Sequence, residues 1–429
     1  MGKKVLVIGQ GGRENALVWK LAQSPEIEKL YAAPGNPGMS CYAECIPIAA
    51  QDEEKLLEFA LKESIDLTVV GPEDPLMAGM VDLFNKHGLL VFGPTAAAAR
   101  LEGSKVFSKN LMKKYNIPTA AYEVFTDYDS ACTFARSFTD NGRRVVIKVD
   151  GLAAGKGVVV AENWEEAEQA ISAAMVEKSF GEAGQAIIIE ECLQGEEVSV
   201  FSLSDGQRTI FLVSAQDHKR VFDNDEGPNT GGMGAYINPP IYTAELQRRV
   251  EETIITPTIK AMDSEGCPFR GVLYTGLMIT DDGPRVLEYN ARFGDPETQV
   301  IMPVIQGDIL PLFEGVARGN IEGLNVTVEA GACVCVVLAS EGYPGNYEKG
   351  KVITGLDSLD DNTIVFHSGT ALQDGQLVTA GGRVMALSLK AASMSEALEQ
   401  VYKEINKINF EGMHFRKDIG NRALKREEG

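Results

Sequence analysis

The chain has 429 residues, enough for two or three domains, and its 44% apolar and 24% charged residues are typical of globular proteins. A formal charge of −21 at pH 7 opposes binding to a nucleic-acid backbone or to an anionic membrane surface. Phosphorylated small molecules remain compatible with this charge, because one local positive loop is enough to bind a phosphate group.

Cysteine and histidine show no functional spacing. The seven cysteines form no C-x-x-C pair, and the four histidines are far apart. Such scattered cysteines are typical of reduced thiols in the cytoplasm. The N-terminal run KKVLVIG is too short for a signal sequence, and no window reaches the ~18 apolar residues of a membrane span. We therefore expect a cytoplasmic chain that acts on small molecules, without a nucleic-acid or membrane partner, and that can work as a monomer.

Residues 1–103 alternate short apolar runs with helical patterns. Strands are expected at KVLVIG, EKLYAAPG, DLTVVGP and LLVFGP, and helices over RENALVWKLAQS, DEEKLLEFALKES and LMAGMVDLFNKHG. This alternation predicts an α/β domain with a parallel sheet covered on both faces. Because Gly/Pro-rich loops follow the strands, we expect a ligand site at the carboxyl edge of the sheet.

The first loop, GQGGRE, matches the dinucleotide-binding fingerprint only in part. Gly9 and Gly11 fit its first two glycines, but Glu14 replaces the third. The second strand ends in the letters AAP, without an acid for a ribose hydroxyl. A helix N-terminus beside Arg13 suits one phosphate group, and a plain strand–helix turn is the alternative.

The segment VVIKVDGLAAGKGVVVAE, residues 145–162, has the glycines and lysine of a phosphate-binding loop. A Walker P-loop needs G-x-x-x-x-G-K-[ST] between a strand and a helix. Here the spacing is one residue short, Gly157 stands at the Ser/Thr position, and GVVVAE predicts a second strand. The segment is therefore expected to be a glycine-rich hairpin that closes over a triphosphate, with Lys148 on the incoming strand.

Two later segments could complete a nucleotide site. QAIIIEECLQGEEVSVFSL predicts two strands joined at Glu190 and Glu191, a hinge that can offer backbone groups to adenine. YTGLMITDDGPRVLEYNARFG predicts a strand pair with Glu288 and Asn290 on one face and Arg292 continuing it. Two oxygen ligands and a guanidinium suit Mg²⁺ bridging phosphates, and a solvated edge strand is the alternative.

The chain is expected to end in a small mixed α+β domain. CVCVVLAS, TIVFHSGT and QLVTAGGRVMALSLK predict strands, and SMSEALEQVYKEI predicts a helix, without independent chemistry. We therefore expect three domains, at residues 1–103, 104–325 and 326–429, with a lid subdomain at about 120–192.

Several motifs together resemble a known family. Lys105, Lys148, the loop 151–157, EECL with Glu197, and Glu288/Asn290 follow one another as in the ATP-grasp ligases. Within these, GQGGRE, APGNPG, VGPEDPL, QDHKRVFD, GPNTGGMGAY and NARFGDPETQ are similar to the phosphoribosylamine–glycine ligase family over essentially the full length. Two departures stand out. Asn15 stands where the family usually has His, and in FDNDEGPNTGG Asn224 and Glu226 stand where Gly and Lys are expected.

The resemblance implies a two-step reaction of de novo purine biosynthesis. ATP phosphorylates the carboxylate of glycine, and the amine of 5-phosphoribosylamine then attacks the glycyl phosphate. The products are glycinamide ribonucleotide, ADP and phosphate, and the implied cofactors are ATP as co-substrate and Mg²⁺ or Mn²⁺. Because no enzyme nucleophile is needed, catalysis would rest on positioning and charge neutralisation.

The resemblance also implies the site residues. The ATP-binding set is Lys105, Lys148, Gly151, Gly155, Lys156, Gly157, Glu190, Glu191, Cys192, Leu193 and Glu197, and the metal ligands are Glu288 and Asn290. The substrate-binding set is Gly11, Gly12, Arg13, Glu14, Gly35, Asn36, Glu73, Asp217, Gly231, Gly232, Met233 and Arg292. Arg292, Lys148 and Asp217 are the implied catalytic residues, and an ion pair of Asp217 with Lys219 is the alternative role for Asp217.

The N-terminal loop is expected to hold the sugar substrate. Gly11, Gly12 and Arg13 would bind the 5′-phosphate of phosphoribosylamine at a helix N-terminus. Asn15 can form hydrogen bonds there but cannot carry the positive charge of a histidine, so Asn15→His is expected to be tolerated.

Two other functions are considered. An oxidoreductase using GQGGRE as a dinucleotide site is disfavoured by the missing ribose acid. A non-catalytic nucleotide-binding module is disfavoured because the lysines, the metal pair and Arg292 occur together.

Overall fold

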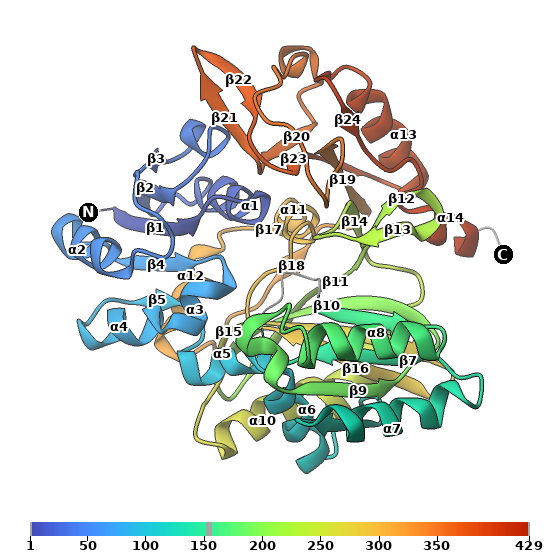
Figure 1. Ribbon diagram of the computed structural model, residues 1–429. Coiled ribbons are helices and arrows are strands. Elements are labelled where there is room, and N and C mark those ends of the chain that lie inside the picture. The colour runs from blue at the N-terminus through green and yellow to red at the C-terminus, as the bar shows by residue number, and fades with distance from the viewer. Residues whose placement is uncertain (1, 152–156, 428–429) are drawn as a thin grey trace.

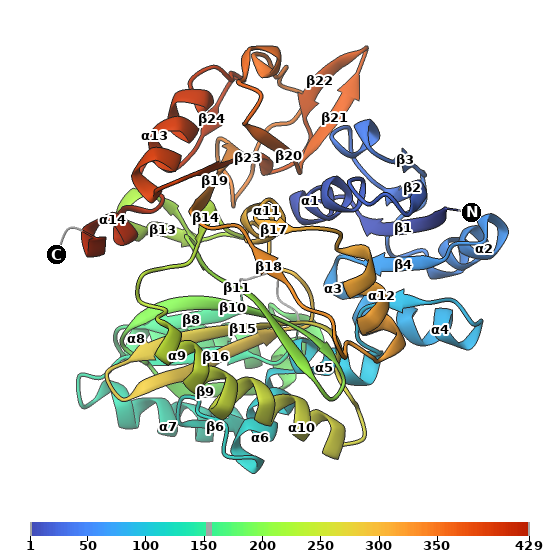
Figure 2. The same cartoon turned by 180° about the vertical axis from the view of Figure 1, so that it is seen from behind.

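The computed structural model describes residues 2–151 and 157–427. In Figure 1 the first hundred residues lie on the left, the C-terminal residues on top, and most of the chain between them below. Figure 2 shows the same three-part arrangement from behind.

The N-terminal sheet is parallel, as predicted, with strand order β3-β2-β1-β4-β5. Its strands are β1 (Lys3–Gly9), β2 (Ile27–Pro34), β3 (Glu44–Cys45), β4 (Leu67–Val70) and β5 (Val91–Phe92). Along β1, Val5 and Val7 pack in one apolar cluster, whereas Leu6 and Ile8 pack in another. Alternate side chains thus serve the two faces of a sheet that is buried on both sides.

The helices of this part are α1 (Gly12–Leu21), α2 (Glu53–Glu63), α3 (Glu73–Ala78), α4 (Met80–Lys86) and α5 (Ala96–Gly103). The single helix expected over LMAGMVDLFNKHG is wrong, because the chain breaks into α3 and α4 at Gly79. Gly79 has φ +98°, a left-handed conformation that ends a helix and that glycine adopts without strain. Glu73 is the first residue of α3, directly after Pro72.

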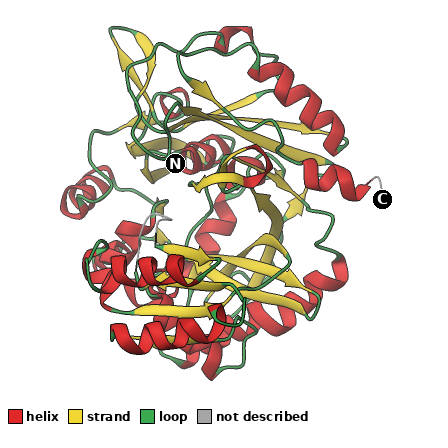
Figure 3. Ribbon diagram, turned by 45° about the vertical axis from the view of Figure 1, so that its right-hand side comes forward, coloured by secondary structure: helices red, strands yellow, loops and turns green. Residues whose placement is uncertain are grey.

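A four-stranded antiparallel sheet follows, with order β6-β9-β7-β8. Its strands are β6 (Tyr122–Phe125), β7 (Val145–Val149), β8 (Val158–Ala161) and β9 (Ile187–Glu191), and the helices of this region are α6 (Lys105–Lys114), α7 (Tyr128–Thr139) and α8 (Trp164–Met175). Lys148 of β7 pairs with Val158 of β8, which confirms the expected hairpin around the glycine loop. Figure 3 shows helices lining this sheet.

The largest sheet has nine strands, and its main path runs β16-β15-β10-β11-β14-β19-β23-β20. The path strands are β10 (Glu196–Asp205), β11 (Thr209–Asp217), β14 (Gly234–Ile237), β15 (Arg270–Thr280), β16 (Gly283–Asn290), β19 (Ala332–Ser340), β20 (Ile364–His367) and β23 (Arg383–Ala391), and β24 (Met413–His414) pairs with β19. Because β14 pairs with β19, the C-terminal strands continue the sheet that carries β10, β11, β15 and β16.

The remaining helices are α9 (Ala244–Val250), α10 (Thr256–Ser264), α11 (Thr298–Ile301), α12 (Leu310–Arg318), α13 (Met394–Ile405) and α14 (Asn421–Glu427). Three short strand pairs complete the fold: β12 (Arg220–Phe222) with β13 (Glu226–Asn229), β17 (Ile305–Gln306) with β18 (Thr327–Val328), and β21 (Thr370–Gln373) with β22 (Gln376–Thr379). Within the described ranges, no helix has the length and apolar character needed to cross a membrane.

Candidate active site

Lysines from two elements converge on β16. Lys148 Nζ, from β7 of the four-stranded sheet, donates to the carbonyl of Leu287 at 3.2 Å. Lys105, the first residue of α6, donates to the carbonyl of Gly151 at 2.9 Å. Ser104 caps this helix by accepting a hydrogen bond from Phe107 N, which fixes where α6 begins. The four-stranded sheet therefore contacts β16 through Lys148, and both lysines lie close enough to Glu288 to act on its charge.

Glu190 holds two of these cations. Its Oε2 lies 3.1 Å from both Lys148 Nζ and Lys109 Nζ, and all three side chains are almost fully buried. Burial lowers the pKa of Lys109 to about 8, although Glu190 opposes the shift. Glu190, which was expected at the adenine hinge, thus forms ion pairs with Lys148 and Lys109 and orients Lys148. Sequence reasoning missed Lys109, which lies one helical turn after Lys105 and on the same face of α6.

The expected hinge joins the two sheets. β9 ends in the four-stranded sheet at Glu191, and β10 begins at Glu196 in the nine-stranded sheet. Glu191 Oε1 accepts from Ala121 N at 2.9 Å and lies 3.5 Å from Arg285, so this side chain stabilises the hinge. Cys192 and Leu193 are half-buried in the connection.

Glu288 lies in a group of opposite charges on the large sheet. Lys219 Nζ is 3.6 Å from Glu288 and 3.9 Å from Glu197. Burial alone would raise the pKa of Glu288, but Lys219, Lys148 and Lys105 outweigh it and keep this pKa below its ordinary value. Asn290 follows two residues later on β16 and is half-buried. The geometry places Lys219, which was considered only as a partner of Asp217, beside the predicted metal strand.

Asp217, at the end of β11, does not form the ion pair with Lys219 that was considered as its alternative role. Among the described residues, the ion pairs of Lys219 are with Glu197 and Glu288, and Asp217 Oδ1 is buried without a hydrogen-bond partner. Burial, with Glu297 nearby, raises the pKa of Asp217 well above its ordinary value. Asp217 Oδ1 is therefore a buried acceptor without a hydrogen-bond partner in the part of the chain that the structure describes.

The glycine-rich loop after β13 lies against Asp217. Gly232 has φ +115°, and a Cβ atom there would lie 2.8 Å from Asp217 Oδ1 and 2.3 Å from Pro296 Cδ. Only glycine fits this position. Met233 is fully buried, and its N–H and carbonyl bond to His218 O and Val337 N, so it anchors the loop in the core.

Arg292 lies just beyond β16 between two carboxylates. Its Nε is 3.2 Å from Glu73 Oε2, and its Nη2 is 2.9 Å from Glu102 Oε1. Glu102 also accepts from Ala291 N at 2.7 Å, and burial raises the pKa of this acid. Sequence reasoning missed Glu102, because nothing in the α5 sequence distinguishes it from an ordinary helical glutamate.

Glu73 connects Arg292 to the N-terminal loop, because Arg13 Nη1 lies 3.6 Å from the same Glu73 oxygen. Arg13 Nε also donates to Glu14 Oε1 at 2.5 Å, and Glu14 Oε2 accepts from Gly11 N at 2.7 Å. Glu14 thus takes the place of the third fingerprint glycine by closing the loop with its side chain. A continuous line of alternating charges runs from Glu102 to α1.

Asn36 and Asn15 tie the N-terminal part to the C-terminal strands. Asn36 Nδ2 donates to the carbonyls of Gln10 and His367, both at 2.8 Å. Asn15 is 1% exposed, and its Oδ1 accepts from His367 N at 2.7 Å. The side chain expected beside the sugar phosphate thus bonds to the end of β20. Gly35, before Asn36, has φ +72° and lies against Cys45.

The unusual loop FDNDEGPNTGG is accommodated by its backbone. Asn224 has φ 59°, a left-handed conformation that asparagine adopts more readily than most residues, which accounts for its place where glycine was expected. Its N–H donates to Asp418 at 2.8 Å. Glu226 is exposed.

Within the lid, Gly151 has φ +108°, and Gly157 is buried and accepts a hydrogen bond from Val149 N. Gly155 and Lys156 lie outside the described residues. Among those that are described, no three His, Cys, Asp or Glu side chains form a metal-binding group.

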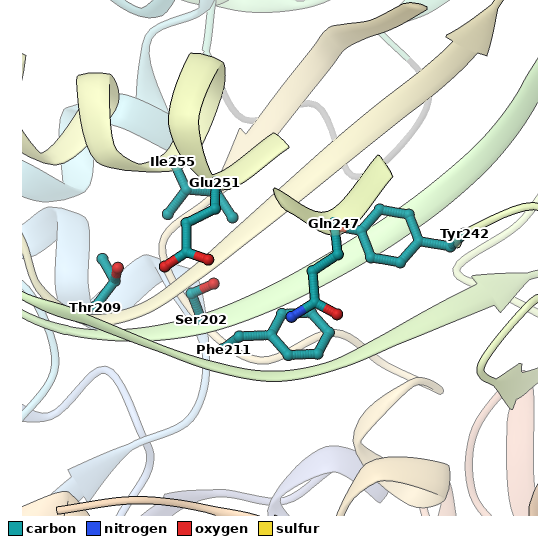
Figure 4. A pocket seen from close by; sticks show the side chains of 7 residues that line it. All are labelled: Ser202, Thr209, Phe211, Tyr242, Gln247, Glu251 and Ile255. Atoms are coloured by element: carbon teal, nitrogen blue, oxygen red, sulfur yellow. The ribbon is translucent and has the colours of Figure 1, made fainter. Parts of the chain in front are cut away.

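A narrow hollow elsewhere on the large sheet has no features of a nucleotide site (Figure 4). It is lined by Ser202, Thr209, Phe211, Tyr242, Gln247, Glu251 and Ile255. No lysine, arginine or predicted site residue lines it, so the group of lysines around Glu288 is the stronger candidate for phosphate chemistry.

Comparison with known proteins covers almost the whole chain. Phosphoribosylglycinamide synthetase families match residues 3–102 (N domain), 103–298 (ATP-grasp (A) domain) and 333–422 (C domain). Phosphoribosylamine–glycine ligase of Halalkalibacterium halodurans is 50% identical over 421 residues, covering 98% of this chain and 97% of that relative. The ligase of Pseudomonas aeruginosa is 49% identical, with 99% of both chains covered.

Solved structures of known proteins are also similar to this chain. The crystal structure of phosphoribosylamine–glycine ligase from Thermotoga maritima is similar with a TM-score of 0.85 and 34% identity, over 97% of this chain and 100% of that one. The biotin carboxylase domain of Hydrogenobacter thermophilus 2-oxoglutarate carboxylase, solved with MgADP, shares the fold with a TM-score of 0.75 at 17% identity, over 100% and 98% of the two chains. The chain belongs to the phosphoribosylglycinamide synthetase family.

Proposed function

We propose that this chain is an ATP-dependent ligase that joins glycine to 5-phosphoribosylamine in de novo purine biosynthesis. The products are glycinamide ribonucleotide, ADP and phosphate, and the intermediate is glycyl phosphate. The observation that carries the proposal is full-length similarity to ligases of this name, together with the convergence of Lys105, Lys148, Glu288 and Arg292 on one site.

ATP would bind between the two sheets. Lys105 and Lys148 would contact its phosphates, the hairpin from Gly151 to Gly157 would cover them, and residues 191–193 would offer backbone groups to adenine. Glu197 would bind the ribose. Glu190 would act through Lys148, because both of its observed ion pairs are with lysines. In this proposal, residues 104–325 would bind the nucleotide, and residues 1–103 would bind most of the sugar phosphate.

Mg²⁺ or Mn²⁺ would be held by Glu288 and Asn290. Two oxygen-bearing side chains two residues apart suit a metal that takes its other ligands from water and phosphate oxygens. The lowered pKa of Glu288 supports this role, since the carboxylate is ionised at neutral pH. The metal would supply neutralisation of phosphate charge during transfer.

The amino acid would lie between Arg292 and Asp217. Arg292, oriented by Glu73 and Glu102, would stabilise the carboxylate as it attacks the γ-phosphorus and ADP leaves. Gly231 and Gly232 would let the backbone approach so small a substrate. Asp217 would accept a hydrogen bond from an amine, because Oδ1 has no partner among the residues that the structure describes. When the sugar amine attacks the carbonyl carbon, phosphate leaves and the nitrogen loses a proton.

Phosphoribosylamine would bind at the start of α1, with Gly11, Gly12 and Arg13 at its phosphate. Its other neighbours would be Glu14, Gly35 and Asn36, which shape this loop. We further propose that the protein works as a monomer in the cytoplasm. The seven cysteines are all free thiols, which supports a reducing compartment.

The test is phosphate release and amide formation from ATP, glycine and freshly made phosphoribosylamine, with each substrate omitted in turn. With glycine labelled by ¹⁸O in its carboxylate, one labelled oxygen is expected in inorganic phosphate. Pyrophosphate as a product, or no label in phosphate, would contradict the acyl phosphate. An absorbance change with a nicotinamide cofactor would instead support the oxidoreductase alternative.

A further inference from the structure

Two residues of the C-terminal part bond to the two backbone polar groups of Gly231. Gly231 N donates to the Tyr343 hydroxyl at 2.9 Å, and Arg383 Nη1 donates to Gly231 O at 2.7 Å. Tyr343 follows β19, and Arg383 is the first residue of β23. Neither residue was expected to belong to the site, because the C-terminal sequence showed no chemistry of its own.

Arg383 also reaches the segment after Arg292. Its Nη1 donates to the carbonyl of Asp295 at 2.8 Å and lies 3.2 Å from Asp295 Oδ1. The Asp295 carboxylate in turn accepts from Gln299 Nε2 at 2.7 Å and approaches Arg13 N at 3.5 Å. One guanidinium therefore connects the loop beside Asp217 with the segment that contacts α1.

Thr230 and Met233 anchor the two ends of the loop through their side chains, whereas Gly231 and Gly232 between them have no side chains to pack. Gly231 is exposed, and a Cβ on it would lie 2.9 Å from Arg383 Cζ. Gly232 lies against Asp217 with a backbone conformation that few other residues adopt. Without side chains, backbone hydrogen bonds determine where this peptide lies and how far it is from Asp217.

We propose that Tyr343 and Arg383 are positioning residues that hold the backbone on both sides of Gly231 in the geometry that binds glycine. This inference rests on the proposed function and assigns part of the amino-acid site to the C-terminal strands. Tyr343 acts through the loop alone, and Arg383 acts through the loop and through Asp295.

The central test is Tyr343→Phe, which removes the acceptor of Gly231 N and keeps the aromatic ring. We expect the KM for glycine to rise roughly 2- to 10-fold, as for the loss of one hydrogen bond, while the KM for ATP stays unchanged. Hydrogen exchange of the peptide spanning residues 226–235 should become faster. The matched control is Tyr347→Phe, since the ring of Tyr347 lies 6.4 Å from that of Tyr343 and its hydroxyl has no hydrogen bond among the described residues.

A second variant, Arg383→Lys, keeps the charge, but its shorter side chain cannot contact Gly231 and Asp295 together. It should also raise the KM for glycine, and it provides the test if Tyr343→Phe does not fold. Faster exchange of the loop with an unchanged KM for glycine in both variants would overturn the proposal. If the unmodified protein forms no amide from glycine, the proposed function fails. The hydrogen-exchange rates of residues 226–235 would still show whether Tyr343 and Arg383 hold the loop.

Discussion

Glu73 shows how one carboxylate can serve two cations from distant parts of the chain. Its Oε2 lies 3.2 Å from Arg292 Nε and 3.6 Å from Arg13 Nη1. Burial alone would raise the pKa of Glu73, but the two guanidinium groups lower it from 4.5 to about 2. Since the folded-state pKa is below the unfolded value, the stabilisation is complete above pH 4.5 and is lost as pH falls toward 2.

Glu73→Gln should therefore lower the free energy of unfolding by about 2 kcal/mol near pH 7, since one pKa unit is worth ~1.4 kcal/mol and solvent reaches part of this side chain. The difference from the unmodified protein should shrink as pH falls below 4.5. Denaturant unfolding at several pH values measures it. Glu322→Gln is the control, because Glu322 is 71% exposed. A difference that does not change with pH would contradict the ion-pair account.

Glu288→Gln tests the proposed metal strand. The change removes a carboxylate charge that would hold the metal at neutral pH. The rate of phosphoryl transfer should fall roughly 10²–10³-fold, because the metal would no longer stabilise the phosphate charge in the transition state. The variant should still fold, which a cooperative thermal unfolding transition would show. The matched control is Asp282→Asn in the turn of the same hairpin, where the side chain is 85% exposed. A normal rate of ADP formation at ordinary Mg²⁺ would show that Glu288 only borders solvent.

The start of α1 is the element on which the sugar-phosphate proposal depends. Gly11 precedes the helix with φ −83°, so alanine fits its backbone, but the added Cβ would lie 2.9 Å from Glu14 Oε2 and 3.3 Å from Asp295 Oδ2. The change therefore disturbs the loop without straining the main chain.

Gly11→Ala should raise the KM for phosphoribosylamine about tenfold, equivalent to ~1.4 kcal/mol of binding free energy, and leave the KM for ATP unchanged. Steady-state kinetics with each substrate varied provides the measurement. Weaker binding of ATP alone would mean that the two phosphate sites were assigned to the wrong substrates.

At the scale of the whole molecule, the nine-stranded sheet joins the nucleotide region to the C-terminal strands. All nine residues of β19 are buried, and β19 pairs with β14 on one side and β23 on the other. Removing β19 would expose the backbone edge of β14 and an apolar surface to water.

A chain ending at residue 325 is therefore expected to be largely insoluble or to lack a cooperative unfolding transition. The soluble fraction after expression and a thermal scan followed by circular dichroism measure these properties against the full-length chain. A soluble residue 1–325 fragment that unfolds cooperatively and binds ATP would instead support an independent domain boundary at that point.

Most of the local elements could be predicted from the amino-acid sequence, with the break between α3 and α4 as an exception. The parallel N-terminal sheet followed from alternating strand and helix patterns, and the β7–β8 hairpin followed from β-branched residues after Gly157. The two-residue period of β16 similarly predicted that Glu288 and Asn290 share a face. These features depend on neighbours within a few residues, so the sequence contains the information directly.

Contacts between charged or polar residues far apart in the sequence became apparent only in the folded chain. Glu190 and Lys109 are 81 positions apart, yet they form a buried pair, and Asn15 bonds to His367 across 352 positions. Periodicity cannot show such contacts, because they depend on how separate elements pack and which polar groups are buried together. For the same physical reason, Arg383 and Tyr343 looked like ordinary residues of the C-terminal strands until the folded chain brought them to the backbone of Gly231.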